Sequence, residues 1–93
     1  MPIEIEQCVK LSNKYGLHAR ASTRLAQLAK EFRSEVKVSR EELEEEVDAK
    51  SILGLLTLGA EKGQKLMVRV TGEDAEGAMS AIVDLFARNF EEE

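Results

Sequence analysis

Apolar residues recur along this chain at two different spacings, and the switches between them constrain the fold more than any other feature. A period of two is typical of half-buried strands, and it predicts four of them, at residues 3–11, 35–39, 47–49 and 65–71. A period near 3.6 is typical of amphipathic helices, and it predicts two long ones, at residues 19–32 and 75–89. A shorter helix is expected to follow Ser51, a suitable N-cap, and to end at Gly59.

The predicted elements follow the order strand–helix–strand–strand–helix–strand–helix. Two long helices can cover one face of a four-stranded sheet and leave the other face to water. We therefore expect an α+β open-faced sandwich, in which helices cover one face of an antiparallel four-stranded sheet. The 93 residues form a single domain over 1–93, too small for a deep enclosed active site, so any chemistry is expected to be shallow and shared with a partner.

The overall charge argues against two classes of partner. With 18 acidic and 13 basic residues, the net charge is −5, which disfavours binding to nucleic acid or to an anionic membrane surface. The start of the chain is acidic and alternating, and no apolar run is long enough to cross a membrane. We expect a cytoplasmic protein.

Several residues with reactive side chains are expected to have no catalytic or metal-binding role. Cys8 is the only cysteine, and inside a predicted strand it is interpreted as a small apolar filler. The acidic run at residues 40–46 is expected to be a solvated loop, and the tail at residues 91–93 is expected to be frayed. One cysteine and one histidine are too few for a metal site, so no metal is expected.

His18 is the only histidine, and it stands at the predicted start of the first long helix. Gly16 precedes it in a turn, and Arg20 follows it. A helix N-terminus presents unpaired N–H groups and the positive end of a dipole, which favour anions. A phosphoryl group on this imidazole would face those N–H groups and Arg20. From the residues alone, a weak helix cap or a surface histidine is the competing interpretation.

A second informative stretch covers residues 50–59. Four leucines and one isoleucine lie within residues 52–58, and a short helix cannot bury all of them on one face. Some are therefore expected to be exposed, and exposed apolar clusters on small proteins mark partner surfaces.

Residues 13–20, NKYGLHAR, and residues 50–59, KSILGLLTLG, resemble the two signatures of the histidine-containing phosphocarrier (HPr) family of the phosphoenolpyruvate-dependent phosphotransferase system. The resemblance implies that His18 takes a phosphoryl group on Nδ1 from phosphorylated enzyme I, with phosphoenolpyruvate as the ultimate donor, and passes it to an enzyme IIA domain. Arg20 would then stabilise the phosphate. Such a protein is a carrier rather than an enzyme, needs no cofactor and is expected to be a monomer.

The resemblance also assigns roles to the second segment. Ser51 would be a regulatory site for an ATP-dependent HPr kinase/phosphorylase, beside its role as a helix cap. The apolar docking patch would consist of Ile52, Leu53 and Leu56. Residues 81–93 resemble the nitrogen-related branch of the family. The pathway that receives the phosphoryl group stays open between sugar uptake and nitrogen control.

Ala21 departs from the family pattern, which usually has proline three residues after the active histidine. Alanine keeps the N–H group that proline lacks, and we expect this additional donor to change the lifetime of phosphorylated His18. Equal hydrolysis rates for the phosphorylated wild type and an Ala21→Pro variant would contradict this expectation.

Three other functions compete with the carrier. A regulatory protein-binding module could use the same fold and act through the Ser51 patch, with His18 merely structural, but such a module needs neither His18 nor Arg20. A metal or catalytic protein built on His18 and the glutamates is disfavoured by the ligand count. A nucleic-acid-binding protein is disfavoured by the acidic charge.

Overall fold

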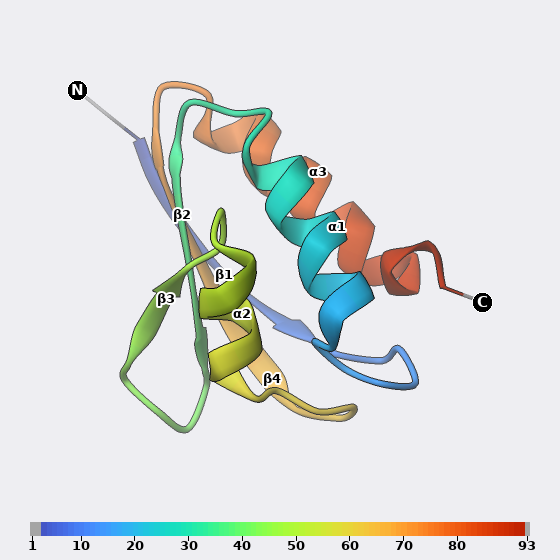
Figure 1. The fold of residues 1–93 in the computed structure, drawn as a ribbon. Coiled ribbons are helices and arrows are strands. Elements are labelled where there is room, and N and C mark those ends of the chain that lie inside the picture. Colours follow the sequence, from blue (N-terminus) through green and yellow to red (C-terminus); the bar gives the residue numbers. More distant parts are fainter. Residues whose placement is uncertain (1–2, 93) are drawn as a thin grey trace.

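The computed structural model describes residues 3–92 and has the expected α+β open-faced sandwich (Figure 1). Four antiparallel strands form one sheet in the order β1-β4-β2-β3, and α1 and α3 lie side by side on one of its faces. In chain order the elements are β1 (Ile3–Lys10), α1 (Ala19–Ala29), β2 (Glu35–Arg40), β3 (Glu46–Asp48), α2 (Ile52–Leu58), β4 (Lys65–Gly72), α3 (Ala75–Ala87) and the 3₁₀ turn η1 (Asn89–Glu91). Across residues 3–92, no helix is long and apolar enough to cross a bilayer.

The core lies between the central strands and the helices. Alternate residues of β2 and β4 point toward the helices and are fully buried, namely Val36, Val38, Leu66, Val68 and Val70. Leu25 of α1 and Ile82 of α3 close the core from the helical side, and both are also fully buried. This packing places α1, which carries His18 at its start, on a rigid support.

Strand β1 is half-exposed, as its alternation predicted, and it is an edge strand that pairs only with β4. Val9 is buried beneath the helices, whereas Ile3 is 42% exposed. Cys8 points to the opposite face from Val9 and is exposed, with its Sγ 3.8 Å from a carboxylate oxygen of Glu41. The interpretation of Cys8 as an apolar filler was therefore wrong. Of the acidic run, residues 41–45 form the exposed loop that was expected, whereas Arg40 ends β2 and Glu46 begins β3.

Both long helices end earlier than their apolar periodicity predicted. Helix α1 ends at Ala29 rather than Phe32, because the next turn tightens and the amide of Phe32 donates to the carbonyl of Ala29. The Lys50 ammonium donates to the Phe32 carbonyl at 2.9 Å and fixes this end. Helix α3 ends at Ala87 rather than Asn89, since Asn89 adopts a left-handed backbone with φ of 54°.

The C-terminal segment is folded back onto the domain through residue 92, so the expectation of a frayed tail was wrong for Glu91 and Glu92. Glu93 lies outside the described residues. Phe90 explains the docking, because its side chain is 1% exposed and its ring centroid lies 4.9 Å from that of Phe86. Burying a phenylalanine contributes about 1.5–3 kcal/mol relative to leaving it exposed, and this helps to hold the short acidic segment in place.

Asp74, at the start of α3, is hydrogen-bonded to the end of the α1–β2 connection. This contact makes the stability of the folded state depend on pH. Its carboxylate accepts hydrogen bonds from the Ser34 hydroxyl and from the amides of Arg33 and Ser34, both amides at 2.9 Å. The Ser34 hydroxyl bond first, and then these amides, lower the pKa of Asp74 below its ordinary value of 3.8.

Because the folded pKa of Asp74 is lowered, its contribution is fully present above 3.8 and is lost as the pH falls through the folded value. We expect Asp74→Asn to be less stable at neutral pH and to lose less stability on acidification than the wild type. Urea unfolding of both proteins across this range measures the difference. Equal pH slopes for the two would show that Asp74 is not a source of the acid dependence.

Candidate functional site

A tight turn before α1 sets the position of His18. Gly16 has φ of +64°, which favours glycine, and its amide donates to the Asn13 carbonyl at 3.3 Å. The next amide, from the buried Leu17, donates to the Ala60 carbonyl at 3.0 Å. The turn therefore ties the start of α1 to the loop that follows α2.

Gly16→Ala is expected to disrupt this turn. A Cβ at position 16 would lie 2.5 Å from the Ala60 carbonyl oxygen and 2.8 Å from the Glu61 Cα, closer than packed atoms approach. The left-handed backbone alone costs about 1–2 kcal/mol for a residue with a Cβ, and the clash adds to this. Gly63→Ala is the matched control, because φ is +92° there but nothing lies within 4 Å of the added Cβ. Urea unfolding should show a larger loss for Gly16→Ala, and equal losses would contradict the clash.

His18 is the N-cap of α1, with an extended backbone and a side chain that turns toward the helix. Its Nδ1 accepts a hydrogen bond from the Arg20 amide at 3.3 Å. Within residues 3–92, no hydrogen bond uses the amides of Ala19 or Ala21. Nδ1 therefore lies at a helix mouth where two further donors are unused, and one of them exists only because position 21 is not proline.

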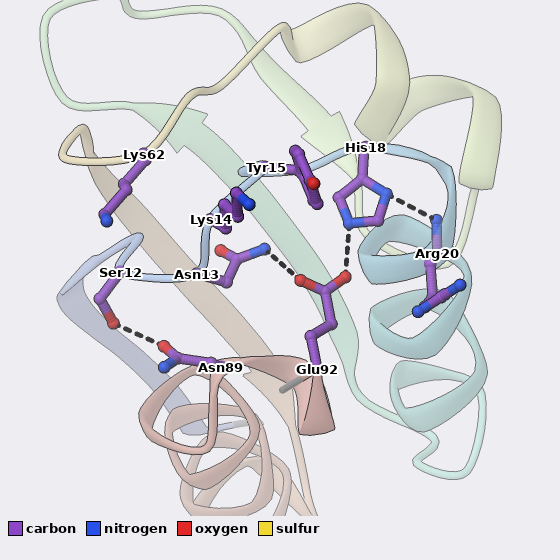
Figure 2. Close-up of a pocket in the computed structure, with 9 residues that line it drawn as sticks. All are labelled: Ser12, Asn13, Lys14, Tyr15, His18, Arg20, Lys62, Asn89 and Glu92. Atoms are coloured by element: carbon purple, nitrogen blue, oxygen red, sulfur yellow. Dashed lines mark hydrogen bonds and ion pairs between the residues drawn. The ribbon is translucent and has the colours of Figure 1, made fainter.

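The opposite ring nitrogen of His18 faces a carboxylate (Figure 2). Since Nδ1 accepts a hydrogen bond, the neutral ring carries its proton on Nε2, and Nε2–H donates to Oε2 of Glu92. The other oxygen of this carboxylate accepts from Asn13 Nδ2 at 3.0 Å, and Asn13 also donates to the Gly16 carbonyl at 2.8 Å. One carboxylate thus joins the tail to the ring and to the turn before it.

The environment of Glu92 favours its ionised form. Burial alone would raise the pKa of this carboxyl group, whose side chain is 12% exposed. Hydrogen bonds from Asn13 and His18, together with the positive charge of Arg20, outweigh burial and lower the pKa below its usual value. At neutral pH a carboxylate anion therefore lies against the imidazole.

An open pocket of about 690 Å³ surrounds this arrangement (Figure 2). It is lined by Ser12, Asn13, Lys14, Tyr15, His18, Arg20, Lys62, Asn89 and Glu92. Three of these residues are cationic, and all three are exposed. The Tyr15 ring packs edge-on against the imidazole, with 5.5 Å between ring centroids. An open pocket lined by three exposed cations suits a small anion.

Helix α2 provides a second exposed feature. Ser51 caps it, accepting a hydrogen bond from the Gly54 amide at 3.0 Å, and Gly59 ends it with a left-handed backbone. Leu55 and Leu58 are buried, whereas Ile52, Leu53 and Leu56 are 37%, 71% and 39% exposed. We call these three residues the α2 patch.

The fold and the histidine site can now be compared with known proteins. The family model described as "PTS HPr component phosphorylation site" matches residues 5–88, nearly the whole chain. The chain belongs to the HPr family. It is a phosphocarrier protein of the phosphotransferase-system type.

Individual HPr proteins match over nearly their full length. Phosphocarrier protein HPr of Xylella fastidiosa is 40% identical over 96% of this chain and 98% of its own. Phosphocarrier protein NPr of Escherichia coli is 36% identical with the same coverage. The crystal structure of HPr from Thermoanaerobacter tengcongensis superposes with a TM-score of 0.89 at 37% identity, covering 96% of this chain and 98% of that one.

In this HPr protein the residues singled out from the sequence fall into two groups. His18 and Arg20 meet at the start of α1 and line the pocket, whereas Ser51 and the α2 patch lie on α2, outside the pocket lining. Sequence reasoning missed Asn13 and Glu92 as parts of the histidine site. The available signal was Phe90, an aromatic residue in an otherwise acidic tail, which requires burial and therefore a docked tail.

Proposed function

We propose that His18 accepts a phosphoryl group on Nδ1 from phosphorylated enzyme I, with phosphoenolpyruvate as the ultimate donor, and passes it to a histidine of an enzyme IIA domain. One observation carries the proposal. Nδ1 bears the lone pair and faces the open N-terminus of α1, while Nε2 is occupied by Glu92. Membership in the HPr family supports the same reaction class.

The transfer needs no group beyond the side chains and amides present. The Nδ1 lone pair attacks phosphorus, a new P–N bond forms, and the P–N bond on the donor breaks with its electron pair returning to the donor nitrogen. The Arg20 amide, which now donates to Nδ1, would be released to a phosphoryl oxygen. The unused amides of Ala19 and Ala21 and the Arg20 guanidinium would meet the remaining negative charge. Transfer to enzyme IIA is the same displacement in reverse.

We propose that both partners dock on the surface that includes the α2 patch and Tyr15. Tyr15 is 64% exposed and belongs to the turn that Ala60 ties to the end of α2. Apolar side chains would form the buried centre of the interface, and Lys14, Arg20 and Lys62 would pair with acidic groups at its rim. We expect the protein to act as a monomer, in the cytoplasm where phosphoenolpyruvate is available.

Ser51 is proposed as a regulatory site, the substrate of an HPr kinase/phosphorylase. A phosphate there would place charge beside the apolar α2 patch and weaken docking by desolvation and repulsion. We expect Ser51→Asp to raise the KM for enzyme I about tenfold, equivalent to about 1.4 kcal/mol, with little change in kcat. Ser51→Asn is the matched control, because asparagine also caps helices but carries no charge. Equal KM values for the two variants would contradict a charge effect at this position.

The carrier function is tested by intact mass after incubation with enzyme I and phosphoenolpyruvate. One acid-labile phosphoryl addition, removed again by an enzyme IIA domain, is the expected result. No addition with enzyme I from several sources would overturn the proposal. The function would then be that of a regulatory module binding through the α2 patch.

A further inference from the structure

The contact between Glu92 and His18 suggests a role for the C-terminal segment in the phosphotransfer step. We propose that Glu92 is a positioning residue that holds the proton of His18 on Nε2 and presents Nδ1 to the incoming phosphorus. The inference rests on the proposed function of His18. Its basis is geometric, because the two ring nitrogens make opposite contacts, one accepting from the Arg20 amide and the other donating to Glu92.

Glu92 is held in place by a backbone that a detached tail would not adopt. Three consecutive non-glycine residues, Asn89, Phe90 and Glu91, have φ of 54°, 59° and 63°. A left-handed backbone is sterically strained for each such residue, since all three carry a Cβ. Burial of Phe90 beside Phe86 compensates part of this strain, and the result is a sharp reversal that returns the chain to the histidine.

Polar contacts fix the direction of this reversal. The Arg24 guanidinium, from the next turns of α1, donates to the Phe90 carbonyl. The Ser12 hydroxyl donates to Asn89 Oδ1 at 2.7 Å. Asn13 then holds the second oxygen of the Glu92 carboxylate. The carboxylate is therefore anchored from both sides and can orient the imidazole.

The chemical consequence follows from the proton on Nε2. When Nδ1 forms a bond to phosphorus, Nε2 keeps its proton and the ring gains positive charge. No proton enters or leaves the site. The Glu92 carboxylate faces that charge, and so it stabilises the ring as the P–N bond forms, in the way that a buried aspartate orients and stabilises a catalytic histidine. An isolated imidazole exchanges its proton between both nitrogens, and only one of the two tautomers has Nδ1 ready for attack.

The test uses the fact that His18 is the only histidine, so every imidazole resonance in the NMR spectrum belongs to it. In the unphosphorylated wild type we expect the Nε2–H tautomer, with an Nε2 proton that exchanges slowly. In Glu92→Ala only the 3.3 Å bond from the Arg20 amide would still favour this tautomer, and we expect faster exchange of the Nε2 proton and a larger share of the Nδ1–H tautomer. It should also slow phosphorylation by enzyme I about 10- to 100-fold, the size typical of lost orienting partners.

Two further variants separate positioning from simple attachment of the tail. Glu92→Gln keeps the side-chain length and a hydrogen-bond acceptor but removes the charge, and we expect it to keep the tautomer and restore part of the rate. Glu91→Gln is the matched control, because that carboxylate is exposed and pairs with Arg88 instead. It should leave both the tautomer and the rate unchanged.

The inference and the proposed function fail in different ways. A wild type that takes no phosphoryl group would overturn the carrier function, whatever the NMR spectra show. A wild type that is phosphorylated normally, with a Glu92→Ala variant of equal rate, would leave the carrier function intact and overturn the role of Glu92. An unchanged tautomer in Glu92→Ala would overturn it as well, since another group would then be holding the proton.

Discussion

A His18→Ala variant is expected to take up no acid-labile phosphoryl group from phosphorylated enzyme I, the largest change in activity that any single substitution in this chain should produce. The chain has no second histidine that could form the P–N bond in place of His18. The substitution also removes the N-cap of α1, which costs about 0.5–2 kcal/mol. Intact-mass measurement, with circular dichroism to confirm folding, gives the result.

His18→Asn separates the loss of the phosphoryl acceptor from the loss of the helix N-cap. Asparagine accepts a hydrogen bond from a helix amide as His18 does, but its amide group forms no transferable P–N bond. We expect this variant to recover stability without recovering phosphorylation. Acid-labile phosphate remaining on either variant would show that the acceptor is a residue other than His18.

Phe90→Ala is expected to cause the largest loss of stability, about 3–5 kcal/mol, as for other buried phenylalanines truncated to alanine. Its ring is 1% exposed and packs on Phe86. Small domains have about 5–15 kcal/mol of total stability, so the loss is a large fraction of the whole. Urea unfolding should show a lower midpoint.

Phe90→Leu serves as the matched comparison, because it keeps an apolar side chain in the cavity and should cost much less. The alanine variant should also detach the segment that carries Glu92. Its His18 spectrum should then resemble that of Glu92→Ala. A loss below about 1 kcal/mol for Phe90→Ala would show that the tail is not packed as described, since such a small cost is typical of surface positions.

Features governed by local sequence were predicted well. Ser51 was expected to cap a short helix and Gly59 to end it, and both do so. Capping and left-handed termination depend on a few neighbouring residues, so the sequence contains the needed information. The sheet and the helices that cover it were also predicted, because the spacing of apolar residues is visible within each single strand or helix.

Features that depend on contacts between distant segments were not predicted. His18 and Glu92 are 74 positions apart, and Arg24 and the Phe90 carbonyl are 66 apart. The acidic residues of the tail predicted a solvated segment, and no local sequence pattern showed that the Glu92 carboxylate would contact His18. The exposure of Cys8 is different, because its alternation with Val9 and Leu11 already placed it on the face away from the core.

The exposed position of Cys8 makes this chain convenient for following its encounters with other proteins. It is the only thiol in the sequence, it lies on the outer face of the sheet, and it is not part of the His18 pocket. A fluorophore attached there would label every molecule at one defined place, away from α1 and α2. The rotational diffusion of that label would slow when enzyme I or an enzyme IIA domain binds, so affinities could be measured without altering the transfer site.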